Sequence, residues 1–179
     1  SMVLASNTNA ENFNNWLDKL KTEAKRQGIS QKTLDSSLIG IKPIPRVIEL
    51  DRKQPEFTLT FAEYLKRVVS DRRIRIGKSK LKEHKELLRE ISSKYGVQSR
   101  YIVALWGIET DFGRITGGFP VISSLATLAY DGRRSKFFRK ELFLALKIVD
   151  GGHILAKDMI GSWAGAMGQN QFMPSSFHA

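Results

Sequence analysis

The stretch of residues 101–114 most constrains how this chain can fold, because it combines a helical apolar pattern with one central carboxylate. Its sequence is YIVALWGIETDFGR. Leu105 and Trp106 lie four and three positions before Glu109, and Phe112 lies three after it, so all three are neighbours of the carboxylate on a helix. A glutamate is rarely buried without a partner. This placement therefore predicts either a structural ion pair or a carboxyl retained for chemistry.

The environment expected for Glu109 favours the protonated carboxyl. Its three apolar neighbours would remove water from the carboxylate. Gly113 is a typical helix stop, which would leave Glu109 near the negative end of the helix dipole. A carboxylic acid in such a place can donate a proton near neutral pH, as a general acid does. On these residues alone, the ion pair and the general acid both remain open.

Composition limits the class of protein. With 179 residues, 41% of them hydrophobic, the chain is long enough for one core, so we expect one domain or a part of one. No apolar run approaches the roughly 18 residues of a membrane span. The absence of cysteine excludes disulfides and thiolate metal sites but is compatible with any redox compartment. The net charge of +11 favours polyanionic partners such as nucleic acid, anionic lipid or an acidic glycan.

Helical periodicity dominates the first half of the chain. A capping box at Thr8 and Glu11 predicts the start of a helix that closes at Gly28. The apolar stripe of this helix consists of Phe13, Trp16, Leu17, Leu20 and Ala24. A short helix is expected over 31–39, and the proline-containing segment 43–55 is expected to be extended. A second capping box, at Thr60 and Glu63, predicts a helix carrying Tyr64.

The second half is also expected to be helical. Residues 78–94 are highly charged and predict a surface helix that ends near Gly96. Two further helices are expected, one after Pro120 and one over 135–149. The inward side chains of the latter should be Phe138, Leu142, Leu146 and Val149. The final block, with several glycines and alanines between 161 and 168, would allow close approach of the backbone to another element or a ligand.

Motifs for cofactors and metals are missing from the sequence. We find no glycine-rich phosphate loop, no Cys/His metal spacing and no Ser/His/Asp set. His84, His153 and His178 stand apart from one another and are interpreted as solvated or structural residues. The sequence therefore predicts neither a cofactor nor a metal site.

Three ordered blocks together resemble the catalytic domain of the lytic murein transglycosylase B family, within the lysozyme-like superfamily. The blocks are GIETDFGR, LATLAYDGRRSKFF and GSWAGAMGQNQFMPSS. The resemblance extends from about residue 12 to the end of the chain. It implies a mainly α, lysozyme-like helical catalytic domain with an N-terminal helical segment. Asn170 departs from the family pattern, in which glycine is frequent at this position.

The resemblance also implies roles for individual residues. Glu109 would be the single catalytic acid and base. The predicted substrate-binding residues are Tyr64, Ser162, Gln171, Phe172, Arg133 and Arg134. Among these, Tyr64 would face the sugar, and the two arginines could hold a carboxylate of a stem peptide through bidentate hydrogen bonds. Phe172, with Met173, would form an apolar wall for the sugar or part of the core.

The implied reaction cleaves the β-1,4 bond between N-acetylmuramic acid and N-acetylglucosamine in peptidoglycan without water and leaves a 1,6-anhydromuramoyl end. It needs no second carboxylate. Asp111 lies two positions from Glu109 and so points to another side of the helix, which predicts a structural role as an ion pair or a solvated helix end. The expected partner is peptidoglycan glycan with its stem peptides, without cofactor or metal.

Two other functions remain open at this point. A hydrolytic muramidase of the same superfamily would need a positioned water and usually a second carboxylate. A basic helical protein that binds nucleic acid would explain the charge and the basic runs at 72–75 and 78–85. The second alternative leaves Glu109 and the GSWAGAMG block without a role, so we expect no nucleic-acid partner.

We expect the boundaries of the chain to be as follows. Residues 1–10 would be a flexible N-terminal segment in which Ser1 and Met2 are a cloning remnant, and residues 11–179 the catalytic domain. The ending soon after the small-residue block predicts that a C-terminal part of the domain is missing. An export signal absent from this sequence would place the natural protein in the periplasm or cell envelope of a bacterium, with membrane attachment of the precursor and oligomeric state left open.

Overall fold

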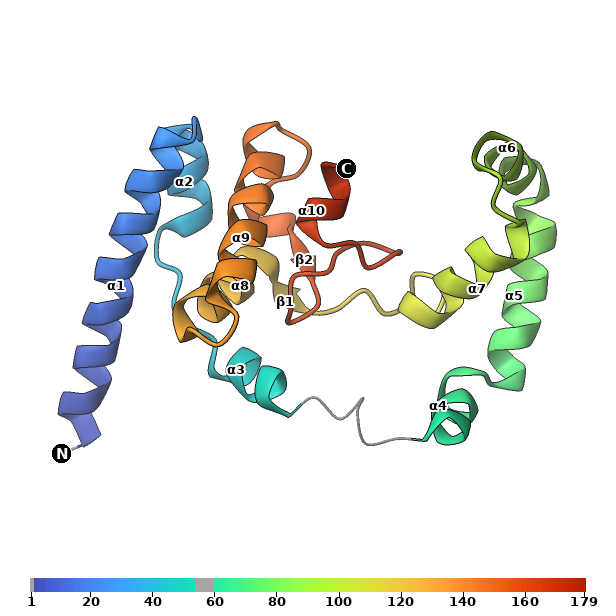
Figure 1. Cartoon of the computed structure of the whole chain (residues 1–179), viewed down its shortest axis with the longest axis horizontal. Helices are drawn as coiled ribbons and strands as arrows, with labels where there is room; N and C mark the ends of the chain where they lie inside the picture. Colours follow the sequence, from blue (N-terminus) through green and yellow to red (C-terminus); the bar gives the residue numbers. More distant parts are fainter. Residues whose placement is uncertain (1, 54–59) are drawn as a thin grey trace. The chain divides into compact units, whose positions relative to one another are not determined.

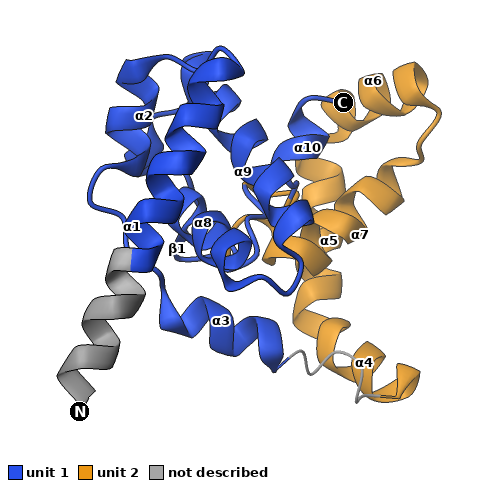
Figure 2. Ribbon diagram, turned by 60° about the vertical axis from the view of Figure 1, so that its left-hand side comes forward, with its two compact units in different colours: residues 1–53, 117–167, 172–179 blue, residues 54–116, 168–171 orange. Residues whose placement is uncertain are grey.

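The structure of the chain is a computed structural model that describes residues 2–53 and 60–179, with side chains from residue 12 onward (Figure 1). The fold is mainly α, as the sequence predicts. The chain forms two compact units, which are described separately (Figure 2). Unit 1 comprises residues 1–53, 117–167 and 172–179, and unit 2 comprises residues 54–116 and 168–171. Within the described ranges, no helix combines the length and apolar character needed to cross a membrane.

Unit 1 contains the first and last helices of the chain. Its elements in chain order are α1 (Met2–Arg26), α2 (Gln31–Leu38), α3 (Pro45–Arg52), β1 (Phe119–Pro120), α8 (Val121–Asp131), α9 (Ser135–Asp150), the 3₁₀ helix η2 (Ala156–Asp158), β2 (Ile160–Gly161) and α10 (Pro174–Phe177). The antiparallel partners β1 and β2 form its two-stranded sheet. The predicted helices over 31–39, after Pro120 and over 135–149 are confirmed as α2, α8 and α9.

The core of unit 1 gathers the predicted apolar stripes. On α1, the buried side chains are Phe13, Leu17, Leu20 and Ala24, and Trp16 packs against them partly buried. They join Leu142 and Leu146 of α9 and most of α8, in which every residue from Val121 to Ala129 except Ser123 is buried. Helix α1 begins before Thr8, and the side chains of the predicted capping box lie outside the described residues.

The extended segment predicted for 43–55 is wrong where it covers α3. Pro45 is the first residue of this helix. The missing proline N–H has no cost there, because the first N–H groups of a helix have no intrahelical acceptor. The preceding Ile44 is extended, as a residue before proline should be. Val47 then enters the core of unit 1 fully buried, so tertiary packing stabilises a helix that the count of prolines alone argues against.

The small residues of the last block make the close backbone approaches that the sequence predicts. A Cβ on Gly161 would lie 2.2 Å from the carbonyl oxygen of Ala166, and one on Gly165 would lie 2.6 Å from Leu125 Cδ2. The carboxylate of Glu141, on α9, accepts a 2.9 Å hydrogen bond from the backbone N–H of Ser175 at the start of α10. These contacts hold the last segment of unit 1 against α8 and α9.

Unit 2 consists of four helices among the described residues and the short segment 168–171. The helices are α4 (Phe61–Val68), α5 (Asp71–Glu83), α6 (Lys85–Tyr95) and α7 (Ser99–Thr110). The predicted capping box of α4 is confirmed, since Thr60 and Glu63 exchange both hydrogen bonds. The single surface helix predicted for 78–94 is wrong: the chain breaks at His84 into α5 and α6. Gly96 ends α6 in the left-handed conformation, as predicted.

We predict that Gly117→Ala destabilises unit 1, whereas Gly118→Ala does not. Gly117 has a φ of +100°, and an added Cβ would lie 2.0 Å from the backbone oxygen of Gly161, so the β1 and β2 pairing would have to shift. The expected loss is about 2 kcal/mol or more, from backbone strain and overpacking. The neighbouring Gly118 has no heavy atom near such a Cβ and is the matched control. Urea unfolding of both variants tests this, and equal midpoints would contradict it.

Candidate active site

Glu109 lies in the last turn of α7 with its side chain exposed. The prediction that apolar neighbours cover it is wrong: Leu105 is 59% exposed, and only Trp106 and Phe112 are partly buried. The buried face of α7 instead carries Val103, Gly107 and Thr110. Glu109 is two positions from Gly107 and therefore on another side of the helix. Its carboxylate makes no hydrogen bond or ion pair with another described residue, which leaves it free to meet a ligand.

The chain leaves α7 through an unusual turn directly after Glu109. Asp111 and Phe112 have φ values of 51° and 60°, and Gly113 follows with 85°. Non-glycine residues rarely adopt this left-handed conformation, and each costs about 1–3 kcal/mol unless its surroundings impose it. The turn is held by hydrogen bonds from Asp111 N to Gly107 O (3.1 Å) and from Phe112 N to Trp106 O (3.2 Å).

Asp111 forms the structural ion pair that the sequence predicts for it, and it is not a solvated helix end. Its side chain is 1% exposed and is paired with three arginines, at 2.6 Å from Arg114 Nε, 2.9 Å from Arg72 Nη1 and 3.5 Å from Arg73 Nε. The hydrogen bond from Arg114, followed by the one from Arg72, lowers the pKa of Asp111. Asp111 is therefore a buried carboxylate that is held in ion pairs inside unit 2. Glu109 is the exposed carboxylate next to this turn.

The ring of Phe112 explains two glycines on neighbouring helices. A Cβ on Gly107 of α7 would lie 2.7 Å from Phe112 Cζ, and one on Gly77 of α5 would lie 3.5 Å from the same atom. The ring also meets Trp106 edge to face, with centroids 5.7 Å apart. The ring of Phe112 can fold back over α7 because Gly107 has no side chain. The same ring packs the turn against α5 at Gly77.

The segment 168–171 provides further polar groups next to this turn within unit 2. Trp106 Nε1 donates a 2.6 Å hydrogen bond to Gln169 Oε1, and Thr110 Oγ1 donates a 2.7 Å hydrogen bond to Gln169 O. Gln171, with a φ of 50°, donates from Nε2 to Thr116 O (3.1 Å) and Gly168 O (2.9 Å). The amide oxygen of Gln171 accepts no hydrogen bond from another described residue. It remains available to a ligand.

The other site residue predicted in unit 2 is Tyr64. It lies on α4 and is 41% exposed. Every side chain of α4 except Val68 is exposed, so Tyr64 is a surface residue of unit 2. Tyr64 thus remains compatible with a sugar contact.

Ser162 and Phe172, both in unit 1, are held by the glycine-rich block. Ser162 Oγ accepts hydrogen bonds from the backbone N–H groups of Ala164 (3.3 Å) and Ala166 (3.0 Å), so its hydroxyl proton still has a donor role available. Phe172 is 56% exposed, while Met173 packs against the core. The sequence predicts that these two residues form either an apolar wall for the sugar or part of the core. Phe172 presents an exposed apolar surface, and Met173 belongs to the core.

Arg133 and Arg134 already hold a carboxylate of their own unit. Arg133 Nη1 donates to Asp51 Oδ2 (3.1 Å) and to the Asp51 backbone oxygen (2.6 Å), and Arg134 Nη2 donates to Asp51 Oδ1. Asp51 is buried, whereas the arginine side chains are 48% and 43% exposed. The Asp51 contact orients both guanidinium groups and leaves other N–H donors on each of them free of described partners.

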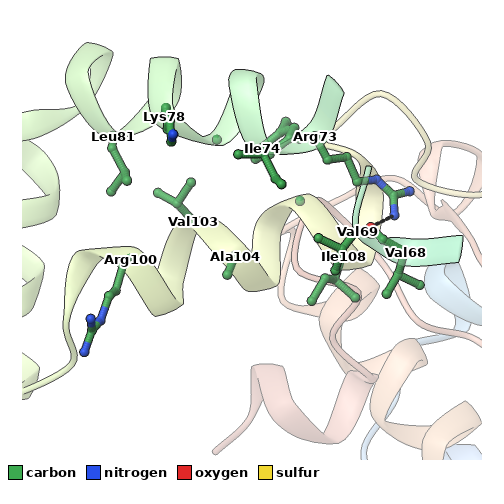
Figure 3. A pocket seen from close by; sticks show the side chains of 13 residues that line it. Val68, Val69, Arg73, Ile74, Lys78, Leu81, Arg100, Val103, Ala104 and Ile108 are labelled. Atoms are coloured by element: carbon green, nitrogen blue, oxygen red, sulfur yellow. Dashed lines mark hydrogen bonds between the residues drawn. The ribbon is translucent and has the colours of Figure 1, made fainter. Parts of the chain in front are cut away.

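An apolar groove of about 240 Å³ lies between α5 and α7 in unit 2 (Figure 3). Figure 3 shows Leu81 on α5 and Val103 on α7 pointing toward one another, while Ile108 lies with Val68 and Val69 at the other end of the groove. None of the predicted site residues lines this groove. This groove and the exposed carboxylate of Glu109 are therefore separate features of unit 2.

The hydrogen bonds that join Thr110 and Trp106 to Gln169 were not predicted from the sequence. Thr110 was part of the GIETDFGR block without a role of its own, and it is 1% exposed with its hydroxyl fully used in hydrogen bonds. The signal that could have found Thr110 and Gln169 is their position close to Glu109 and Gln171 inside two matched blocks, whereas Trp106 lies one position before the first block. Among the described residues, no cluster of three or more His, Cys, Asp or Glu side chains could hold a metal ion.

Comparison with known proteins gives consistent matches. The family described as "Transglycosylase SLT domain" matches residues 12–179. The membrane-bound lytic murein transglycosylase B of Escherichia coli (strain K12) is 29% identical over 97% of this chain and 49% of its own length.

Two solved structures from Pseudomonas aeruginosa are also similar. SltB3, crystallised in complex with NAG-NAM-pentapeptide, is 43% identical with a TM-score of 0.88, over 93% of this chain and 44% of that one. The soluble lytic transglycosylase SltB1 is 33% identical with a TM-score of 0.84, over 91% of this chain and 56% of that one. This chain thus spans about half the length of the relatives it matches.

We predict that Asp111→Asn destabilises unit 2 at pH 7 and that the difference from the unchanged protein shrinks in acid. Because the folded-state pKa of Asp111 is lowered, its stabilisation is present above the unfolded value of about 3.9 and is lost as pH falls below it. Asp158→Asn is the control, since Asp158 is exposed and its carboxylate has no described partner. Urea midpoints at pH 7 and pH 3 measure this. A constant difference between the two pH values would count against the ion pairs.

Proposed function

The chain belongs to the transglycosylase SLT domain family, and from this premise we propose that it cleaves peptidoglycan as a lytic transglycosylase with Glu109 as its single acid and base. The observation that carries the proposal is the state of the two carboxylates on one turn. Glu109 is exposed and free of described partners, whereas Asp111 is buried and held by three arginines.

The reaction would use Glu109 twice. Protonated Glu109 gives its proton to the glycosidic oxygen between N-acetylmuramic acid and N-acetylglucosamine as the C1–O bond breaks. The resulting carboxylate then removes the proton from the C6 hydroxyl of the same muramoyl residue. The C6 oxygen bonds to C1 and closes the 1,6-anhydro ring, which regenerates protonated Glu109. The step consumes no water.

The absence of an available second carboxylate on this turn favours this route over ordinary glycoside hydrolysis. Hydrolases place two carboxyl groups about 5–9.5 Å apart, one as acid and the other as nucleophile or base for water. Asp111 cannot act as the nucleophile or as the base for water while its oxygens accept hydrogen bonds from Arg72, Arg73 and Arg114. An intramolecular hydroxyl supplies the nucleophile without such a partner, since it is already attached to the reacting sugar.

Four polar or aromatic residues are proposed to hold the glycan. Tyr64 and Phe172 offer exposed aromatic faces for sugar rings. The described hydrogen bonds of Ser162 and Gln171 leave two groups available to a ligand. Ser162 can donate its hydroxyl proton, and the amide oxygen of Gln171 can accept a hydrogen bond. Donor and acceptor groups on rigid turns suit the hydroxyl and acetamido groups of these sugars.

Arg133 and Arg134 are proposed to bind a carboxylate of the stem peptide. Their remaining guanidinium donors are exposed, and Asp51 holds both side chains in place. SltB3, the relative with 43% identity, was crystallised with NAG-NAM-pentapeptide and with NAG-anhNAM-pentapeptide. A substrate of this type would place the protein in the cell envelope of a bacterium.

A hydrolytic muramidase is the alternative reaction at the same carboxylate. Product mass separates the two reactions, because a hydrolysed end is one water heavier than an anhydro end. Mass spectrometry of fragments released from purified peptidoglycan therefore tests the reaction class directly. Anhydro ends support the proposal, and exclusively hydrated ends overturn it.

We predict that Glu109→Gln lowers the release of anhydro fragments at least about 100-fold, because the variant loses its general acid and base. Folding should be unchanged, since the Glu109 carboxylate has no described partner to lose. Glu90→Gln is the matched control, an exposed glutamate of unit 2 without a described side-chain contact. Chromatography coupled to mass spectrometry measures the release. Substantial turnover by Glu109→Gln would show that another group is the acid.

We predict that affinity for peptidoglycan falls as salt is raised and that part of this fall requires the stem peptides. Charge attraction between exposed groups weakens as the Debye length shortens, from about 10 Å at 0.1 M to about 3 Å at 1 M salt. Binding to intact and to peptide-stripped glycan is measured over this range. Equal binding to both materials, without salt dependence, would remove Arg133 and Arg134 from the proposal.

A further inference from the structure

We infer that Gln169 is a positioning residue for Glu109: it clamps the last turn of α7 from both sides of the proposed catalytic carboxyl. The inference rests on the proposed function, since it assigns a purpose to a contact of the Glu109 turn. Gln169 itself need not touch the substrate. It acts through Trp106 and Thr110, which stand three positions before and one position after Glu109.

The clamp consists of two hydrogen bonds to one residue. The side-chain oxygen of Gln169 accepts from Trp106 Nε1 at 2.6 Å, and its backbone oxygen accepts from Thr110 Oγ1 at 2.7 Å. Thr110 Oγ1 in turn accepts from Gly113 N at 2.9 Å. The buried hydroxyl of Thr110 thus links Gln169 to the strained turn that follows Glu109.

Gly113 provides the space for this arrangement. A Cβ at this position would lie 2.7 Å from Gln169 Oε1 and 2.9 Å from Gln169 Cδ. The φ of +85° at Gly113 also suits glycine. The turn is therefore shaped so that the Gln169 side chain can pass over it and reach Trp106.

A clamp at this place has a physical reason. The last turn of a helix has fewer intrahelical hydrogen bonds than the interior and frays more readily. Glu109 lies in that turn, and its exposed side chain has no described contact to orient it. Proton transfer requires the donor within hydrogen-bond reach of the reacting oxygen, so restraint of the backbone on both sides of Glu109 favours turnover more than binding.

The test is a double-mutant cycle with Gln169→Leu and Trp106→Phe. Leucine removes the acceptor, and phenylalanine removes the indole donor. We expect each single variant to lower kcat about tenfold, the upper range for one hydrogen bond, with KM little changed. The double variant should be no slower than the slower single variant, because both substitutions remove the same contact. Soluble glycan fragments serve as the substrate, and anhydro ends are counted.

Gln98→Leu is the matched control. Gln98 is exposed at the N-cap of α7 and its side chain makes no capping hydrogen bond, so the same change of residue type there should leave kcat unaltered. A second readout does not depend on activity. The ¹H–¹⁵N signal of the Trp106 indole, assigned with Trp106→Phe, should shift and exchange faster with solvent in Gln169→Leu.

The outcomes separate this inference from the proposed function. If Glu109→Gln is inactive while Gln169→Leu keeps the original kcat, the clamp is overturned and the catalytic role of Glu109 stands. Additive losses in the double variant, or a Trp106 indole signal unchanged in Gln169→Leu, also overturn the clamp. Activity retained by Glu109→Gln contradicts the proposed function itself, whatever the Gln169 variants do.

Discussion

The pairing of Asp111 with Arg72, Arg73 and Arg114 organises the candidate site. A buried carboxylate is unfavourable unless it is paired, and here the pairing coincides with a backbone turn that non-glycine residues resist. This interaction therefore ties α5 to the end of α7, helps to hold the left-handed turn and occupies the carboxylate of Asp111. Glu109 remains as the free carboxylate on the same turn. In this arrangement, one acidic residue supports the structure and the other, two positions before it, has no described partner.

The elements that could be predicted from the sequence are those whose signals are local. The stripe Phe13, Leu17, Leu20 and Ala24 specifies α1 because one helical period places these side chains on one face, whatever packs there. The capping box at Thr60 works over three residues and needs no distant partner. The three blocks that resemble the lytic murein transglycosylase B family were equally readable. They predicted the family, which is confirmed, and the role of Glu109, which stays a prediction.

The errors concern contacts that no local pattern contains. Periodicity shows which residues neighbour Glu109 on a helix, but it does not show whether another element covers them, and Leu105 is in fact exposed. Three prolines suggested an extended segment, yet Val47 is buried in the core and Pro45 begins a helix there. Asp51 meets Arg133 across 82 positions, a separation at which sequence gives no distance information. The error at α3 comes from a tertiary interaction that overrides a local preference, and the error at Leu105 comes from a cover that periodicity alone does not supply.

The chain path through the two units has a consequence for synthesis. Neither unit is continuous in sequence: unit 1 is interrupted by residues 54–116, and unit 2 receives residues 168–171 only after most of unit 1 has been made. A ribosome adds about 5–20 residues per second, so α7 leaves it several seconds before Gln169 follows. During that interval Trp106 and Thr110 lack the acceptors that they have in the finished protein. The turn that carries Glu109 is therefore completed late, when Gln169 has been synthesised and can accept these two hydrogen bonds.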